Sequence, residues 1–75
     1  MIMDESEKEV VQEVFSSVHP YLNRPSGLEE AIEDISEESS DLDEFERKFD
    51  ALISEQEDPS TKADYRIFIN KFRSQ

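Results

Sequence analysis

Hydrophobic residues recur along this chain at intervals of three and four, the spacing that places side chains on one face of an α-helix. The first such stripe predicts a helix over residues 5–18 that ends before Pro20, with Ser6 and Glu9 as a capping box at its start. This stripe consists of Val10, Val11, Val14, Phe15 and Val18.

Two further stripes follow the segment HPYLNRPSG, which contains two prolines and the only glycine and is predicted to be a loop. They predict helices over residues 27–37 and 41–55, separated by the short break SSD. The predicted capping pairs are Ser26 with Glu29, and Ser40 with Asp43. The stripes consist of Leu28, Ala31, Ile32 and Ile35, and of Leu42, Phe45, Phe49, Leu52 and Ile53.

The last segment fits two kinds of structure. Asp58 and Pro59 suit the N-cap and the first position of a helix, and Phe68 and Phe72 continue with helical spacing. A strand is the alternative, because alternate positions are also apolar, namely Tyr65, Ile67 and Ile69. We predict a helix, since a single strand would find no hydrogen-bonding partner elsewhere in this chain.

Together the segments predict an all-α fold, a small bundle of about four short amphipathic helices that forms one domain over residues 1–75. A chain of this length buries only roughly 60% of its unfolded surface, so a weak homodimer is an alternative to a monomer. The predicted core consists of Val10, Val14, Phe15, Val18, Leu28, Ile32, Ile35, Leu42, Phe45, Phe49, Leu52, Ile53, Phe68, Ile69 and Phe72.

The charge is strongly negative and unevenly distributed. With 20 acidic and 8 basic residues the net charge is −12. Residues 28–58 hold fourteen acids and two bases, whereas residues 59–75 hold one acid and four bases. Such a chain is repelled by nucleic acid and by anionic membranes, and it favours a positively charged protein partner. We expect the basic last helix to lie against the acidic middle of the chain.

Neither catalysis nor a metal or cofactor site is expected. The chain has no cysteine, its single histidine, His19, lies in a loop, and one glycine is too few for a phosphate-binding loop. The segment DLDEFERKFDAL begins like a calcium loop, but it has Glu46 where that loop needs glycine and Leu52 where it needs glutamate. We therefore expect a protein that is not an enzyme.

The densest charge lies in EEAIEDISEESSDLDEFE, residues 29–46, which has ten carboxylates and no basic residue. On the second predicted helix these acids form two ridges with a spacing of four residues: Glu29, Glu33 and Glu37, and Glu30, Asp34 and Glu38. Like charges at this spacing destabilise a helix by a few tenths of a kcal/mol per pair, and neither ridge contains a lysine. We interpret the ridges as a surface for a cationic partner, and a solubilising face is the alternative.

The run LEEAIEDISEESSDLDEFERKFDALISEQ, preceded by the loop HPYLN, resembles the small acidic immunity proteins of bacterial toxin systems. Those of contact-dependent growth inhibition and of colicin-type bacteriocins are the most similar. The resemblance covers residues 10–72 and is one of size, charge and helix order. It implies a compact helical protein that binds a cognate nuclease toxin and blocks its active site or substrate groove. The tandem aromatic signature of the DNase-colicin immunity proteins is absent, because the loop has only Tyr21.

The sequence thus predicts an inhibitor that covers the nucleic-acid-binding cleft of a basic partner, most specifically a nuclease toxin. Tyr21 is either an aromatic anchor for that partner or a cap on the core. Two alternatives stay open: a DNA mimic of phage or plasmid origin, and a helical adaptor that uses an apolar stripe containing Ile67, Phe68 and Phe72. The predicted contacts are Tyr21, Glu30, Glu33, Asp34, Glu37, Glu38, Asp41, Asp43 and Glu44.

The cellular location follows from what the sequence lacks. No apolar run approaches the roughly 20 residues of a membrane span, and the acidic N-terminus has no secretory signal. With no cysteine available for disulfides, we expect a cytoplasmic protein without membrane contact.

Overall fold

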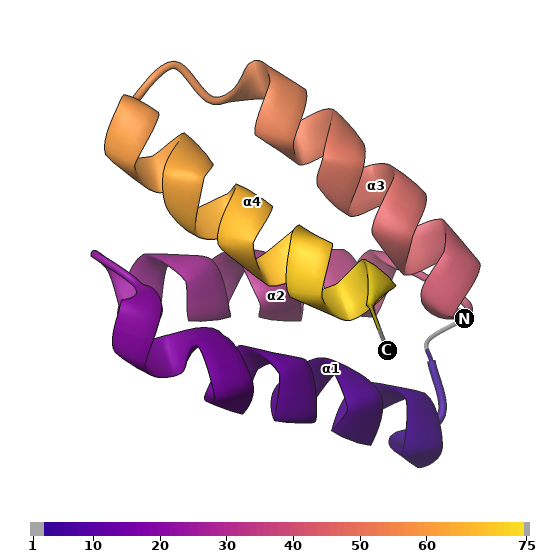
Figure 1. Cartoon of the computed structure of the whole chain (residues 1–75). Coiled ribbons are helices and arrows are strands. Elements are labelled where there is room, and N and C mark those ends of the chain that lie inside the picture. The colour runs from indigo at the N-terminus through magenta and orange to yellow at the C-terminus, as the bar shows by residue number, and fades with distance from the viewer. Residues whose placement is uncertain (1–2, 75) are drawn as a thin grey trace.

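The computed structural model describes residues 3–74, and this range forms four α-helices and one 3₁₀ turn, with no strand (Figure 1). α1 (Glu5–Val18) is followed by η1 (His19–Tyr21), α2 (Pro25–Glu38), α3 (Leu42–Glu55) and α4 (Pro59–Arg73). The predicted all-α bundle is confirmed, and the last segment is a helix rather than a strand.

α4 is the helix around which the others are arranged. It contacts α1, α2 and α3, and α2 likewise contacts each of the other helices. α2 and α4 therefore lie between α1 and α3 (Figure 1). Because α2 has neighbours on both sides, its two acidic ridges face different parts of the molecule.

Aromatic side chains fix α3 against α4. Phe45, Phe49 and Phe68 are fully buried, and the ring centroids of Phe49 and Phe68 lie 5.1 Å apart. Tyr65 and Phe72 extend this cluster along α4. Each such pair contributes about 0.5–1.5 kcal/mol beyond the burial of its area. The cluster therefore determines which acidic residues α4 can reach with its basic side chains.

The predicted core is largely confirmed. Val10, Leu42 and Leu52 are only half-buried, since they lie at the edges of their stripes. Buried hydrophobic residues outside the predicted set are Met3, Val11, Ala31 and Tyr65. The apolar stripe of the adaptor alternative is not exposed, because Phe68 and Phe72 are buried and Ile67 is half-buried, and this counts against that alternative.

The predicted caps of α1 and α3 are wrong, because an aspartate one or two positions from the predicted serine does the capping. Asp4 caps α1 in a capping box with Glu7, so that Ser6 lies inside the helix. Asp41 caps α3 by accepting a hydrogen bond from the Glu44 N–H, and Ser40 lies outside the helix. The predicted cap of α4 by Asp58, with Pro59 at its first position, is confirmed.

α2 differs from its predicted form at its start. It begins at Pro25, two residues earlier than predicted, because proline suits the first position of a helix. Ser26 and Glu29 therefore lie inside the helix and form no capping box, and the N-cap residue, Arg24, supplies no side-chain hydrogen bond. The helix needs its capping group from another part of the chain.

Candidate functional site

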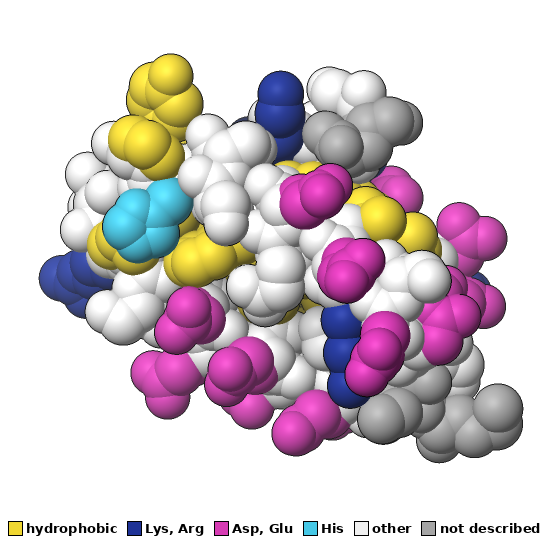
Figure 2. Space-filling model, turned by 90° about the horizontal axis from the view of Figure 1, so that it is seen from below, with side chains coloured by type: hydrophobic (Ala, Val, Ile, Leu, Met, Phe, Trp, Pro, Cys, Tyr) yellow, Lys and Arg dark blue, Asp and Glu magenta, His cyan; other side chains and the backbone are white. Residues whose placement is uncertain are grey.

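The two acidic ridges of α2 are present and point outward. All six of their carboxylate residues are exposed, and within residues 3–74 none of their side chains forms a hydrogen bond or an ion pair. On the face turned downward in Figure 1, acidic side chains follow much of the lower edge of the view, and basic ones are few (Figure 2). The ridge residues are Glu29, Glu33, Glu37, Glu30, Asp34 and Glu38.

The ridges border two different grooves. Glu33 and Glu37 face α1 across a groove of about 350 Å³, where Lys8 is the basic residue in the lining. The other ridge borders a groove of about 390 Å³ between α2, α3 and α4. We call the latter the α2 groove; it is lined by Gly27, Glu30, Ala31, Asp34, Ile35, Glu38, Leu52 and Tyr65. The predicted contact residues of α2 therefore form two surfaces rather than one.

Two of the three predicted contacts at the start of α3, Asp41 and Glu44, already have partners within the chain. Asp41 accepts the Glu44 N–H at 2.8 Å, and Glu44 Oε1 accepts the Ser40 N–H at 2.6 Å. The hydrogen bond from the Ser40 backbone, with a smaller contribution from Lys48, holds the pKa of Glu44 below its usual value. Asp43 is exposed and has no such role. Asp41 and Glu44 thus stabilise the start of α3, a role that the capping prediction missed.

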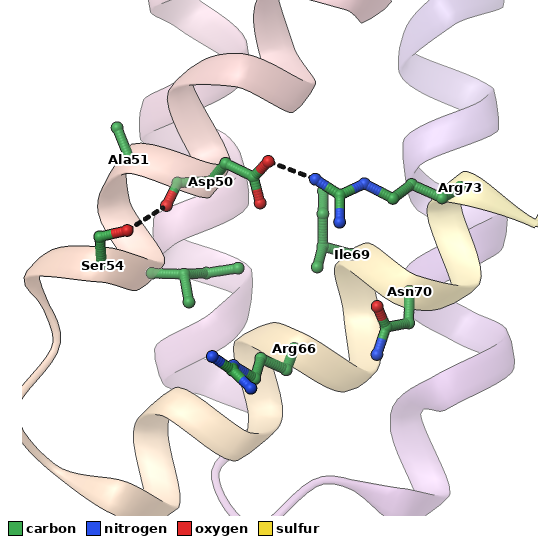
Figure 3. A pocket seen from close by; sticks show the side chains of 8 residues that line it. Asp50, Ala51, Ser54, Arg66, Ile69, Asn70 and Arg73 are labelled. Atoms are coloured by element: carbon green, nitrogen blue, oxygen red, sulfur yellow. Dashed lines mark hydrogen bonds and ion pairs between the residues drawn. The ribbon is translucent and has the colours of Figure 1, made fainter.

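Further along α3, two carboxylates share one arginine of α4. Arg73 Nε donates to Glu46 Oε2 at 2.8 Å, and the Arg73 guanidinium also pairs with Asp50. Figure 3 shows this arginine reaching across the groove between α3 and α4, a space of about 460 Å³ that Arg66 and Asn70 also line. The hydrogen bond that Arg73 donates to Glu46 is the largest of the contributions that raise the pKa of Arg73. The expected pairing of the basic last helix with acidic residues is therefore made to α3, and not to α2.

The start of α2 is capped by a residue that lies forty positions further along the chain. Asp64, which is only 1% exposed, accepts the Arg24 N–H at 2.8 Å and the Asn23 N–H at 3.0 Å. A carboxylate at this end of a helix is also favoured by the helix dipole. Sequence reasoning missed Asp64, although one signal was available, since it is an acid four residues before the buried Phe68, within the apolar stripe.

The other end of α2 also receives a group from outside. The Lys48 ammonium on α3 donates to the carbonyl of Glu38, the last residue of α2. Because α2 has no basic residue in its last turn, this lysine offsets the negative end of the helix dipole. Asp64 and Lys48 therefore hold the acidic helix in place without neutralising its ridges.

Tyr21 lies at the surface, with 73% of its area exposed. It belongs to the turn η1 between α1 and α2, while its neighbour Leu22 is half-buried against the core. The alternative role of Tyr21 as a cap on the core is therefore wrong. His19 in the same turn is exposed and packs edge-on against Phe15, with ring centroids 5.5 Å apart.

The described residues offer neither a metal cluster nor a membrane span. Among residues 3–74, no three His, Cys, Asp or Glu side chains are grouped so that they could hold a metal ion. None of the described helices has the length and apolar character needed to cross a membrane.

Comparison with known proteins identifies a family for this chain. No curated protein and no solved structure matches the chain. Residues 8–75, which include all but the first turn of the bundle, match the MJ1579 family. This chain belongs to the MJ1579 family.

Proposed function

We propose that this chain is an acidic inhibitor that binds a basic protein partner, most specifically a nuclease toxin, and covers its nucleic-acid-binding surface. The observation that carries the proposal is that the ridge carboxylates of α2 have no partner within the described chain. Six exposed carboxylates repeat along two ridges, and the one arginine that forms ion pairs in the described range pairs with α3 instead. We place this interaction in the cytoplasm.

A cationic partner surface would relieve the repulsion that α2 carries. Carboxylates four residues apart repel one another, and lysine or arginine side chains from a partner would replace that repulsion with charge-assisted hydrogen bonds. The net charge of −12 would also steer a basic partner toward this protein and raise the association rate. Tyr21 would add an exposed aromatic anchor at the α1–α2 connection, a residue type enriched in binding hot spots.

The proposal is tested by reversing charge on α2. The partner is first captured on the immobilised chain at about 1 M salt, where the Debye length is about 3 Å and only close contacts retain a protein. The affinity of the purified partner is then measured by calorimetry for a variant with four substitutions, Glu33→Lys, Asp34→Lys, Glu37→Lys and Glu38→Lys. We expect the affinity to fall by about a hundredfold or more, since like charges across an interface cost several kcal/mol.

A matched control carries the same change in net charge at exposed acids elsewhere: Glu5→Lys, Glu9→Lys, Glu13→Lys and Glu57→Lys. It should bind with a moderately slower association rate and a nearly unchanged dissociation rate. Equal loss in both variants, or no loss in the α2 variant, would rule out α2 as the binding surface. Capture of many DNA-binding proteins at low salt and none at high salt would indicate a DNA mimic instead.

A further inference from the structure

The α2 groove differs from the rest of the acidic surface because one of its walls is acidic and the opposite wall is apolar. Glu30, Asp34 and Glu38 form one wall, and the half-buried Leu52 lies on the opposite side, on α3. Ala31 and Ile35 lie between the acidic residues on α2 and are buried or nearly so. A purely solubilising surface has no need of an apolar strip beside its charges.

One polar group in this groove lacks a partner. Tyr65 lines the groove and is only 8% exposed, yet its hydroxyl forms no hydrogen bond with any residue of the range 3–74. No fully enclosed polar atom of the described side chains lacks a hydrogen bond, so this hydroxyl is not sealed inside the protein. The carboxylate of Glu30, which lines the same groove, acts on the Tyr65 hydroxyl, and this places the hydroxyl on the side of the α2 groove. Burial, together with Asp64 and Glu30, raises the pKa of Tyr65, so that the hydroxyl stays protonated and can donate.

We propose that the α2 groove binds an extended segment of the basic partner, in which lysine or arginine alternates with aliphatic residues. This inference rests on the proposed function and deepens it, because it names the part of the partner that is recognised and the groove that receives it.

The spacing of the acidic wall supports an extended occupant. The three carboxylates are four residues apart on a helix, so they repeat every 6 Å or so and span about 12 Å. Every second residue of an extended segment repeats at about 6.7 Å, and its successive side chains point in opposite directions. The cations of such a segment would reach the acidic wall while its aliphatic residues contact Leu52 and the ring of Tyr65.

The hydroxyl of Tyr65 also favours an extended segment over a partner helix. An extended segment has backbone carbonyls without intrachain partners, and one of these can accept the hydrogen bond that Tyr65 is free to donate. The carbonyls in the middle of a partner helix are already occupied by that helix's own N–H groups. A second copy of this chain is a poor occupant, because both copies carry a net charge of −12.

Gly27 makes it possible to block the groove without disturbing the fold. A Cβ atom added there would meet only the Arg24 Cβ, at 4.0 Å, and no glycine of the described chain has a positive φ. A Gly27→Leu substitution would therefore occupy the end of the groove at no cost in backbone strain. Gly27→Ala is the matched control, since it makes the same backbone change with a small side chain.

The experiment uses a fluorescein-labelled octapeptide of alternating lysine and leucine, with fluorescence anisotropy as the readout. We expect binding to weaken by about tenfold in Gly27→Leu and in the double variant Glu30→Gln/Glu38→Gln, and by about fivefold in Tyr65→Phe. Gly27→Ala should bind as the parent does. The variant Glu33→Gln/Glu37→Gln, which removes the same charge from the other ridge, should weaken binding by no more than about twofold.

Several results would overturn the inference, and they differ from those that overturn the proposed function. Equal weakening by the two double variants would show that only the overall charge matters, which would leave the acidic inhibitor standing without its groove. Equal affinity for a peptide of the same composition with its lysines and leucines in separate blocks would refute the alternating segment. Self-association that Gly27→Leu abolishes, measured by sedimentation equilibrium, would assign the groove to a second copy of this chain.

Discussion

α2 and α3 follow one another in the chain, have 14 residues each and are both acidic, yet their charges are in different situations. On α3, Glu46 and Asp50 pair with Arg73, and Asp41 caps the helix. The six ridge carboxylates of α2 have no partner within the described chain. Charge density alone therefore does not distinguish a neutralised surface from one that can receive a partner.

The ends of the two helices are also stabilised differently. α3 begins with its own aspartate, helped by Glu7 of α1, which accepts the Leu42 N–H at 3.2 Å. α2 has no side-chain cap of its own and depends on Asp64 of α4 and Lys48 of α3. The helix with the free charges is thus the one that other helices hold in place, and its stability is tied to the tertiary structure.

The largest expected effect comes from removing the distant cap. Asp64→Ala would remove the buried carboxylate that accepts the Asn23 and Arg24 N–H groups at the start of α2, and we expect the free energy of unfolding to fall by about 3 kcal/mol. Asp41→Ala, the matched change at the start of α3, should cost about 1 kcal/mol, because its site is exposed to water. Urea denaturation followed by circular dichroism measures both. Equal losses would show that the distant cap of α2 contributes no more to stability than the local cap of α3.

The next effect is a stabilisation. Glu33→Gln/Asp34→Asn removes the middle carboxylate of each ridge and with it all four repulsive pairs with a spacing of four residues. We expect the free energy of unfolding to rise by about 1 kcal/mol at low salt, and this gain to shrink with added salt, because salt also screens the repulsion in the parent. Glu46→Gln/Asp50→Asn removes the same charge from α3 but breaks ion pairs, so it should not stabilise. A gain of the same size from both variants would mean that the carboxylates of α2 and α3 are not in different situations.

A smaller effect is expected from Arg73→Met. This substitution keeps an apolar stem but leaves the carboxylates of Glu46 and Asp50 unpaired, so that α3 comes to resemble α2. The pairs are largely exposed, and the melting temperature should fall only slightly at physiological salt. Its dependence on salt concentration should become steeper than that of the parent, as differential scanning calorimetry at several salt concentrations would show. An unchanged salt dependence would mean that Arg73 does not neutralise α3.

The smallest effect concerns alkaline pH. Tyr65 has a pKa raised mainly by burial and further by Asp64 and Glu30, so its neutral form is favoured in the folded state. Its contribution to stability is complete below the unfolded pKa of about 10 and is lost as the pH rises through the folded value. In a Tyr21→Phe background, the phenolate absorbance reports Tyr65 alone. Glu30→Gln should lower its pKa slightly, whereas Glu46→Gln on α3 should not; a pKa that is insensitive to Glu30 would separate Tyr65 from the acidic wall.

Much of the fold followed from local spacing. The stripes Val10–Val18 and Leu42–Ile53 predicted the first and third helices almost to the residue, because a period of three and four is a property of the helix itself. Asp58 and Pro59 marked the start of α4 for the same reason. The acidic ridges of α2 were also predictable, since residues with a spacing of four lie on one face of any helix.

The state of those charges was decided only by the tertiary structure. Which carboxylates are neutralised depends on where Arg73 lies, and the aromatic cluster around Phe49 and Phe68 places it on α3. The cap on α2 requires Asp64 to approach Arg24 from a distant helix, and the α2 groove requires Leu52 and Tyr65 to meet α2. The sequence by itself determined the helices and the sign of their surfaces, because these depend on neighbouring residues. Packing between distant segments determined which of these charges remain free to bind.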